Sequence, residues 1–214
     1  MNGKCASSSV QGLKKALRRS IRNALKEIPV TIIEERSIAV FDKITQQEFY
    51  KNANCISIFL SMPPPKEIQT WSFVKQCFKD GKSVYVPKVI GLNSNDMIMV
   101  PVDKVEDIQN WPLSNWKIPE PPSAYYNNND NIKNGIGNID LVIVPGLAFS
   151  IEKYRLGQGK GYYDAFFKKL YEARKTIDVP LLVGVGLDEQ IVDTVPVEEH
   201  DYILDYIVTP LKLV

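Results

Sequence analysis

The sequence predicts an α/β fold of three layers, in which helices cover both faces of an open, mostly parallel, Rossmann-like sheet. One observation is that short apolar segments alternate with segments of helical periodicity along the 214 residues, which is typical of parallel sheets. Another is the segment 140–146, "DLVIVPG", whose apolar run does not alternate, as expected of a strand buried on both faces. The length favours one domain over residues 1–214, and we find no internal repeat.

The apolar spacing predicts helices over 12–28, 31–52, 70–79 and 162–174. Pro29 ends the first, Thr31 and Glu34 are typical of a capping box that opens the second, and Gly81 closes the third. Strands are expected at 55–60, 83–87, 97–102, 140–146, 180–186 and 206–209. The stretch 111–137 is rich in Pro, Asn and Gly and is expected to be a loop, with the low-complexity part "YYNNNDNIKNG" inside it.

Composition excludes several classes of protein. The formal net charge is +1, so no global field points to nucleic acid or to an anionic membrane. No apolar run approaches the roughly 18 residues of a membrane span. The single histidine, His200, excludes a site built on several imidazoles.

The cysteines and the first residues bear on location. Cys5, Cys55 and Cys77 form no close pair, which suits a reducing compartment. The first 26 residues contain no acid and are rich in Ser, Lys and Arg, which is also typical of transit peptides. We expect a cytoplasmic protein, because function is assigned below to basic residues that cleavage would remove; a mitochondrial location stays open.

A glycine-rich segment is the first candidate for a site. Gly157, Gly159 and Gly161 follow a strand and precede a helix, an order that places them at the carboxyl edge of the sheet. Neither a Walker loop nor a dinucleotide fingerprint matches, and from the glycines alone a structural turn is as good an interpretation. Arg155 and Lys160 lie in the same segment, so that backbone N–H groups, a helix end and two cations together favour binding of a polyphosphate.

Two acids could accompany that anion. Asp164 lies in the first turn of the expected helix, where it is either a favourable charge at a helix end or a magnesium ligand. Asp201, near the last strand, is by itself a solvated turn residue or a second ligand.

The first expected helix carries a basic stripe, formed by Lys14, Arg18, Arg22 and Lys26. Such a face is usually solvated, and it would equally suit RNA or an anionic surface. Nothing within the helix decides between these alternatives.

At this point the chain resembles a known family, the 5-formyltetrahydrofolate cyclo-ligases, also called methenyltetrahydrofolate synthetases. The family signature is roughly P-G-x-x-F-D-x-x-G-x-R-L-G-x-G-x-G-Y-Y-D, and residues 145–164 are "PGLAFSIEKYRLGQGKGYYD". The resemblance extends to "KKALRR", "ISIFLSM", "WKIPEP" and "DEQIVDTVPVEEHD", in the expected order over most of the chain.

The resemblance implies a ligase of folate one-carbon metabolism that uses ATP and Mg²⁺. ATP would phosphorylate the formyl oxygen of 5-formyltetrahydrofolate, and the neighbouring anilino nitrogen would then displace phosphate to form the 5,10-methenyl bridge. A formamide is a poor electrophile, and catalysis of such a transfer depends mainly on positioning and charge neutralisation. The implied partner is a small molecule, 5-formyltetrahydrofolate, with or without a polyglutamate tail, and we expect a monomer.

The resemblance also implies the site residues. The nucleotide would contact Lys14, Lys15, Arg18, Arg155, Leu156, Gly157, Gln158, Gly159, Lys160, Gly161, Tyr162 and Tyr163. The folate would contact Arg18, Leu60, Met62, Glu67, Trp116 and Tyr162. Asp164 and Asp201 would hold magnesium, and Lys160, Tyr163 and Arg155 would be catalytic. Glu67 is expected to accept hydrogen bonds from the pterin, and Tyr163 to orient the cyclising nitrogen.

The chain departs from the signature at two positions, where Ser150 replaces Asp and Lys153 replaces Gly. Just after the signature, Ala165 replaces a common Arg that looks peripheral. Lys153 is expected to change a left-handed turn before Arg155.

Two other functions are considered. A folate-binding protein without turnover would keep the folate contacts, but storage needs no triphosphate cradle. A nucleic-acid partner of the basic helix is disfavoured by the net charge of +1.

Overall fold

The computed structural model describes residues 3–64, 66–126, 136, 138–173, 179–199 and 201–214. Its centre is a six-stranded sheet in the order β3-β2-β1-β4-β7-β9. The strands are β1 (Cys55–Ile58), β2 (Ser83–Val89), β3 (Met97–Val102), β4 (Leu141–Pro145), β7 (Leu181–Val185) and β9 (Tyr206–Val208). All neighbours are parallel except β2 and β3. The predicted α/β class with a mostly parallel sheet is confirmed.

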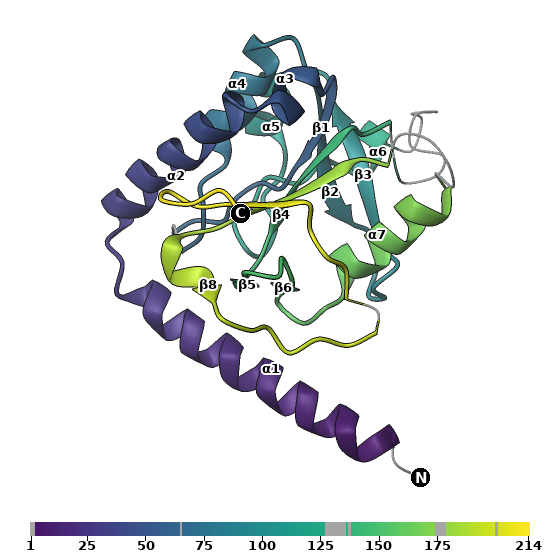
Figure 1. Cartoon of the computed structure of the whole chain (residues 1–214). Helices are drawn as coiled ribbons and strands as arrows, with labels where there is room; N and C mark the ends of the chain where they lie inside the picture. The colour runs from purple at the N-terminus through teal and green to yellow at the C-terminus, as the bar shows by residue number, and fades with distance from the viewer. Residues whose placement is uncertain (1–2, 65, 127–135, 137, 174–178, 200) are drawn as a thin grey trace.

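Helices cover both faces of this sheet (Figure 1). The described helices of the chain are α1 (Gly3–Lys26), α2 (Val30–Thr45), α3 (Glu48–Asn52), α4 (Trp71–Lys79), α5 (Val105–Asn110), α6 (Ser123–Tyr126) and α7 (Tyr162–Ala173). Strand β4 shows why two layers are needed, because Leu141 and Ile143 belong to one buried cluster and Val142 and Val144 to another. The first cluster includes α2 and α4, and the second includes α7.

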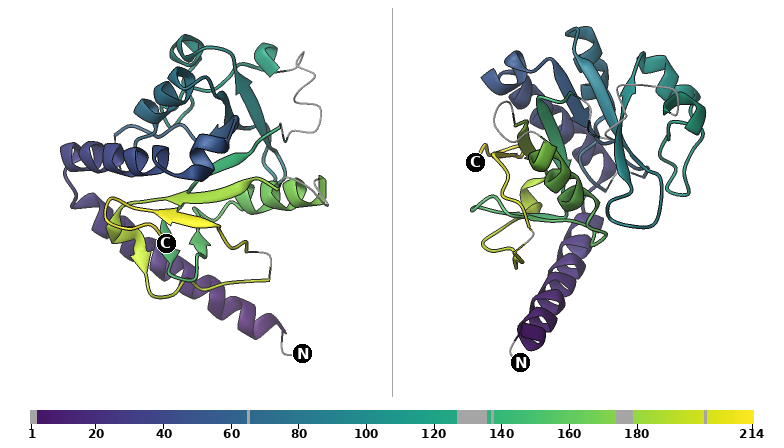
Figure 2. Two further views of the ribbon diagram at one scale, coloured as in Figure 1. Left: turned by 45° about the horizontal axis from the view of Figure 1, so that its top comes forward. Right: turned by 90° about the vertical axis from the view of Figure 1, so that its right-hand side faces the viewer.

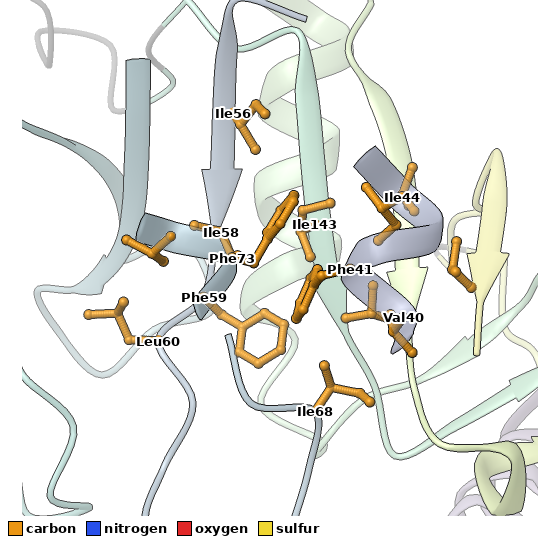
Figure 3. Close-up of a cluster of buried hydrophobic side chains, with 14 of the residues drawn as sticks. Val40, Phe41, Ile44, Ile56, Ile58, Phe59, Leu60, Ile68, Phe73 and Ile143 are labelled. Carbon is orange, nitrogen blue, oxygen red and sulfur yellow. The ribbon is translucent and has the colours of Figure 1, made fainter. Parts of the chain in front are cut away.

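The first cluster is a core of buried side chains between the sheet and helices α2 and α4 (Figure 3). Ile56, Ile58 and Ile143 of the sheet face α2 and α4, where the rings of Phe41 and Phe73 stack with centroids 4.3 Å apart. Each fully buried side chain of this size contributes about 1.5–3 kcal/mol.

A second, small sheet lies beside the first and carries the glycine-rich segment. Strand β5 (Ala148–Ser150) pairs antiparallel with β6 (Arg155–Leu156) and parallel with β8 (Ile191–Val192). A 3-10 turn, η2 (Asp188–Gln190), precedes β8, and helix α1 runs across this sheet (Figures 1 and 2). Gln190 joins the two sheets, because its side-chain nitrogen donates to the carbonyl of Gly146 at 2.7 Å.

Several expectations need correction. Helix α1 begins at Gly3, and the predicted helix 31–52 is two helices, α2 and α3. The capping box of Thr31 and Glu34 is wrong: α2 begins one residue earlier, and the N–H groups of Ile32 and Ile33 donate to the carbonyl of Pro29 instead. Thr31 is therefore inside the first turn.

Other bounds shift by a few residues, and short elements were not predicted. Strand β1 stops at Ile58, whereas β2 continues to Val89. Helices α3, α5 and α6 and the small sheet are too short for periodicity to reveal. Of the predicted loop 111–137, residues 127–135 and 137, which hold most of the low-complexity part, lie outside the described residues. No helix that the structure describes is long and apolar enough to cross a membrane.

Candidate active site

The segments predicted to form the site leave the sheet at the point where the order of successive strands changes direction. Strand β1 lies between β2 and β4, so successive strands run outward in opposite directions from this point. In open α/β sheets, ligands bind outside the carboxyl ends of the strands at such a point. Segment 59–62 leaves β1 here, and segment 146–161 connects β4 to α7 from here. Two segments distant in sequence therefore begin at one place on the sheet.

Helix α1 joins this site through its basic stripe. The Arg18 Nε donates to the carbonyl of Gly157 at 2.9 Å, and an Arg22 terminal nitrogen donates to Gln158 Oε1 at 2.6 Å. A Cβ added to Gly159 would lie 3.2 Å from the guanidinium carbon of Arg18. The predicted meeting of α1 with the glycine-rich segment is thus present in the structure, and glycine permits the close approach.

Two glycines adopt the left-handed conformation that turns the segment. Gly159 has φ 98° and Gly161 has φ 73°. A Cβ at Gly161 would lie 3.4 Å from the Ser94 side chain in the β2–β3 connection. The conformation of the backbone, more than a lack of space, explains Gly161.

Lys14 lies buried between two carboxylates. Its ammonium donates to Asp201 Oδ2 at 2.6 Å and to Glu198 Oε2 at 2.9 Å. Burial lowers the pKa of Lys14, but the hydrogen bonds to Asp201 and Glu198 outweigh burial, so the pKa is raised. Lys14 is therefore a charged group already compensated by acids.

Arg155 forms the second buried ion pair. One of its terminal nitrogens donates to Asp164 Oδ1 at 2.8 Å, and its guanidinium lies 5.5 Å from the centroid of the Tyr163 ring. A Cβ added to Gly157 would lie 2.6 Å from this guanidinium. Glycine at 157 therefore leaves room for Arg155 beside the segment.

The Tyr163 hydroxyl is buried and has no hydrogen-bond partner in the described part of the chain. Burial raises the pKa of Tyr163; Arg155 lowers it, and Glu67 raises it further. The Glu67 carboxylate is therefore within electrostatic reach of this hydroxyl. An unpartnered buried hydroxyl costs about 1–3 kcal/mol, which a ligand group would recover.

Glu67 lies on the segment that follows β1. Its Oε1 accepts a hydrogen bond from the backbone N–H of Met62 at 3.1 Å. Burial raises the pKa of Glu67 to about 7. The segments after β1 and β4 thus meet around Tyr163 and Glu67.

Comparison with known proteins decides the family. The model of the 5-formyltetrahydrofolate cyclo-ligase family matches residues 10–210. The chain belongs to the 5-formyltetrahydrofolate cyclo-ligase family. The mouse 5-formyltetrahydrofolate cyclo-ligase is 32% identical over 202 residues, which cover 94% of this chain and 95% of that relative. The Saccharomyces cerevisiae 5-formyltetrahydrofolate cyclo-ligase is 30% identical over 204 residues, covering 91% and 94%.

A solved structure agrees in fold. The NMR structure of the Aquifex aeolicus 5,10-methenyltetrahydrofolate synthetase superposes with a TM-score of 0.72 and 24% identity, over 94% of this chain and 91% of that one. The predicted resemblance to the cyclo-ligase family, and with it the assignment as an enzyme, is confirmed.

The remaining residues implied by the family lie at varied positions. Lys160 is exposed, and it makes no hydrogen bond or ion pair with the residues the structure describes. Leu60, in the segment after β1, is buried and contributes to the core. Leu156 is buried in β6, and Tyr162 is half-buried at the start of α7. Lys15 is exposed on α1 beside the stripe, and Trp116 is 70% exposed on the loop before α6.

The two candidate metal ligands fit magnesium better than a protein-only metal cage. Among described residues, no three His, Cys, Asp or Glu side chains form a metal cluster. Magnesium usually takes one or two carboxylates together with phosphate oxygens and water. The residues present thus fit a nucleotide with its magnesium.

The departures from the signature leave the backbone path intact. Lys153 has φ 68°, so the left-handed turn is kept, and the expectation that Lys153 changes it is wrong. The Ser150 hydroxyl accepts a hydrogen bond from the N–H of Tyr154 at 3.3 Å. The backbone N–H of Lys153 also donates to the carbonyl of Ser150 at 2.9 Å. These bonds hold the turn.

Sequence analysis missed the polar residues that surround the predicted ones. Glu198 binds Lys14, Gln11 donates to Glu198 Oε2 at 2.7 Å, and Gln190 fixes the turn after β4. Glu198 and Gln190 both lie within "DEQIVDTVPVEEHD", so the signal was their place in that segment. Gln11 had none.

Proposed function

We propose that the chain converts 5-formyltetrahydrofolate to 5,10-methenyltetrahydrofolate in a reaction that consumes ATP and requires Mg²⁺. The observation that carries this proposal is the contact between α1 and the glycine-rich segment, where the Arg18 Nε lies 2.9 Å from the Gly157 carbonyl. Cations from two distant parts of the chain surround one bare backbone segment, as a polyphosphate requires.

The proposed chemistry balances as follows. The formyl oxygen accepts the γ-phosphoryl group and ADP is released. The neighbouring anilino nitrogen then attacks the formyl carbon and loses its proton, while the carbon–oxygen bond breaks and inorganic phosphate leaves. The phosphoryl group is needed because the oxygen of a formamide is otherwise a poor leaving group.

The residues of the chain would take the following parts. Lys14, Arg18 and Lys160 neutralise the phosphates together with the N–H groups of the glycine-rich segment, and Asp164 and Asp201 would hold magnesium. Magnesium held there would supply positive charge that helps to neutralise the phosphates. The Tyr163 hydroxyl donates to the reacting part of the folate, since it is buried without a partner among the described residues.

Glu67 is proposed to recognise the pterin. A pterin presents amino and ring N–H donors, and among the described residues the Glu67 carboxylate accepts one hydrogen bond, from the backbone N–H of Met62. Binding N–H donors would favour its ionised form, so we expect proton release from Glu67 when folate binds near neutral pH. Its carboxylate is within electrostatic reach of the Tyr163 hydroxyl.

The direct test measures the absorbance of the methenyl product. Purified protein is mixed with 5-formyltetrahydrofolate, with and without ATP and Mg²⁺. Colour that needs both is the expected result. Binding of folate without colour under any of these conditions would instead indicate a folate-binding protein without turnover.

Location remains part of this proposal: we propose a cytoplasmic, monomeric enzyme, although the Arabidopsis thaliana relative is named as mitochondrial.

A further inference from the structure

The two candidate metal ligands are each bound by a candidate phosphate-binding cation. Asp201 Oδ2 lies 2.6 Å from the Lys14 ammonium, and Asp164 Oδ1 lies 2.8 Å from the Arg155 guanidinium. In each acid the other oxygen makes no hydrogen bond to a residue that the structure describes. Without ligands, the charges meant for phosphate and metal therefore neutralise one another.

Glu198 gives Lys14 a second acid partner. The single positive charge of Lys14 is shared between Glu198 and Asp201, and Arg18 lies within electrostatic reach of both carboxylates. The three side chains are only 6%, 17% and 10% exposed, in the order Lys14, Glu198, Asp201, and salt screens such buried groups little. The cluster is also fixed in place, because the N–H of Glu198 donates to Asp201 Oδ2 at 2.8 Å.

We propose that Glu198 is a positioning residue that keeps Lys14 paired until magnesium withdraws Asp201, so that the site binds ATP and Mg²⁺ cooperatively. The proposal rests on the proposed function. A metal-free triphosphate meets a Lys14 already bound to two carboxylates and an Arg155 already bound to Asp164. When Asp201 and Asp164 turn to magnesium, Lys14 and Arg155 become available to the phosphates. Lys14 has three donors, so it can retain Glu198 and still bind a phosphate oxygen.

Cooperativity of this kind is reciprocal. If magnesium strengthens ATP binding by some factor, ATP must strengthen magnesium binding by the same factor. The proposal gives Glu198 and Asp201 different roles. Glu198 only restrains Lys14, whereas Asp201 both restrains Lys14 and binds the metal.

Titration calorimetry on the full chain tests this without turnover, since no folate is present. ATP is titrated in EDTA and in excess Mg²⁺ into the wild type and into Glu198→Gln, Asp201→Asn and Glu48→Gln. Glu48→Gln is the matched control, because it removes one carboxylate from an exposed pair with Lys51 that lies outside the site. Thermal unfolding of each variant confirms that it is folded.

The expected pattern differs between the two acids. Wild type should bind ATP in EDTA about tenfold or more weakly than with Mg²⁺, a difference of about 1.4 kcal/mol or more. Glu198→Gln should tighten metal-free ATP about three- to tenfold and keep the magnesium effect. Asp201→Asn should tighten metal-free ATP similarly but lose most of the magnesium effect. Glu48→Gln should leave both unchanged.

The outcomes distinguish this proposal from the proposed function. If the wild type forms the methenyl product but neither acid variant binds metal-free ATP more tightly than Glu48→Gln, Glu198 does not restrain Lys14 and the present proposal is wrong while the function stands. If Glu198→Gln does not fold, Asp201→Asn alone decides the restraint on Lys14. If the wild type forms no product and binds no ATP with Mg²⁺, both proposals are wrong.

Discussion

The polar groups at the two ends of the parallel strands differ in whether they have hydrogen-bond partners among the described residues. At the amino ends of β1 and β2, the Tyr50 hydroxyl donates to Asp80 at 2.6 Å, Gln76 donates to the same carboxylate at 2.8 Å, and Lys82 donates to the carbonyl of Ala53 at 2.6 Å. Each of these side chains has a partner within the protein. We call this set, Tyr50, Gln76, Asp80 and Lys82, the closed cluster.

At the carboxyl ends, the polar groups are only partly satisfied. The Tyr163 hydroxyl has no partner, and Lys160 has none, among the residues described. Buried polar groups are normally hydrogen-bonded, and departures from local rules concentrate at functional sites. The closed cluster should therefore serve stability, and the carboxyl edge should serve binding; four substitution experiments test that division.

The largest effect is expected from two lysines. Lys160→Ala should lower turnover about 10²- to 10³-fold, as removal of one charge-stabilising donor does, and should leave the free energy of unfolding within about 0.5 kcal/mol of wild type. Lys82→Ala should do the reverse, because it removes hydrogen bonds to the carbonyls of Lys51 and Ala53. It should cost roughly 1–2 kcal/mol of stability and little turnover.

Product absorbance and urea unfolding measure the two quantities on the same samples. Near-normal turnover in Lys160→Ala would remove Lys160 from the phosphate site. A large loss of turnover in folded Lys82→Ala would show that the closed cluster is not separate from the site.

The second experiment uses Glu67, the acid within electrostatic reach of the Tyr163 hydroxyl. Burial raises the pKa of Glu67 to about 7 from 4.5, so between these values the folded protein holds a proton that the unfolded chain has lost. The folded state is therefore favoured below about pH 4.5 relative to higher pH, and stability falls as pH rises toward 7. Glu67→Gln abolishes this fall.

The measurable result is a stability difference that depends on pH. At pH 8, Glu67→Gln should be more stable than wild type by about 1–3 kcal/mol, allowing for partial exposure, and at pH 4 the two should be alike. Denaturant unfolding over this range measures it, with exposed Glu48→Gln as the control. A difference that is equal at both pH values would show that Glu67 ionises freely in the folded protein.

The third experiment compares two buried tyrosines. Tyr50→Phe removes a partner of Asp80 and should cost about 1–2 kcal/mol, whereas Tyr163→Phe removes a hydroxyl without a partner in the described chain and should cost nothing or add up to about 1 kcal/mol. Turnover should fall only in Tyr163→Phe. Equal destabilisation of both variants, in urea unfolding without ligands, would mean that the Tyr163 hydroxyl is already satisfied.

The sequence predicted the central strand and the basic stripe, but not the pairing of polar side chains across the fold. The non-alternating run of β4 predicted a two-sided strand, and both of its faces are buried. The spacing of Lys14 and Arg18 predicted one stripe, and both reach the site. Periodicity could not predict which residues pair across the fold, so the bond of Lys14 to Glu198 appeared only in the structure.

Local rules failed where tertiary contacts decide. The small sheet has strands of two or three residues, too short for any periodic signal. The capping box at Thr31 failed because the carbonyl of Pro29 already accepts the first N–H groups of α2. The closed cluster joins Tyr50 to a residue thirty positions later, and nothing in either neighbourhood announces that pairing.

The smallest effect concerns two residues with nearly the same backbone angle. Gly81 has φ 71° after α4 and Lys153 has φ 68° before β6. A Cβ at Gly81 would touch nothing within 4 Å, so Gly81→Ala measures the backbone cost alone, roughly 1–2 kcal/mol. Lys153→Gly should recover that cost but lose the bond from its ammonium to the carbonyl of Asp205, 3.1 Å long.

The net gain in Lys153→Gly should therefore be about 0.5 kcal/mol. Lys153→Ala keeps the strained backbone and loses the same bond, so it should be less stable than wild type and separates the two terms in urea unfolding. A Lys153→Gly variant no more stable than Lys153→Ala would mean that the turn imposes no strain on Lys153.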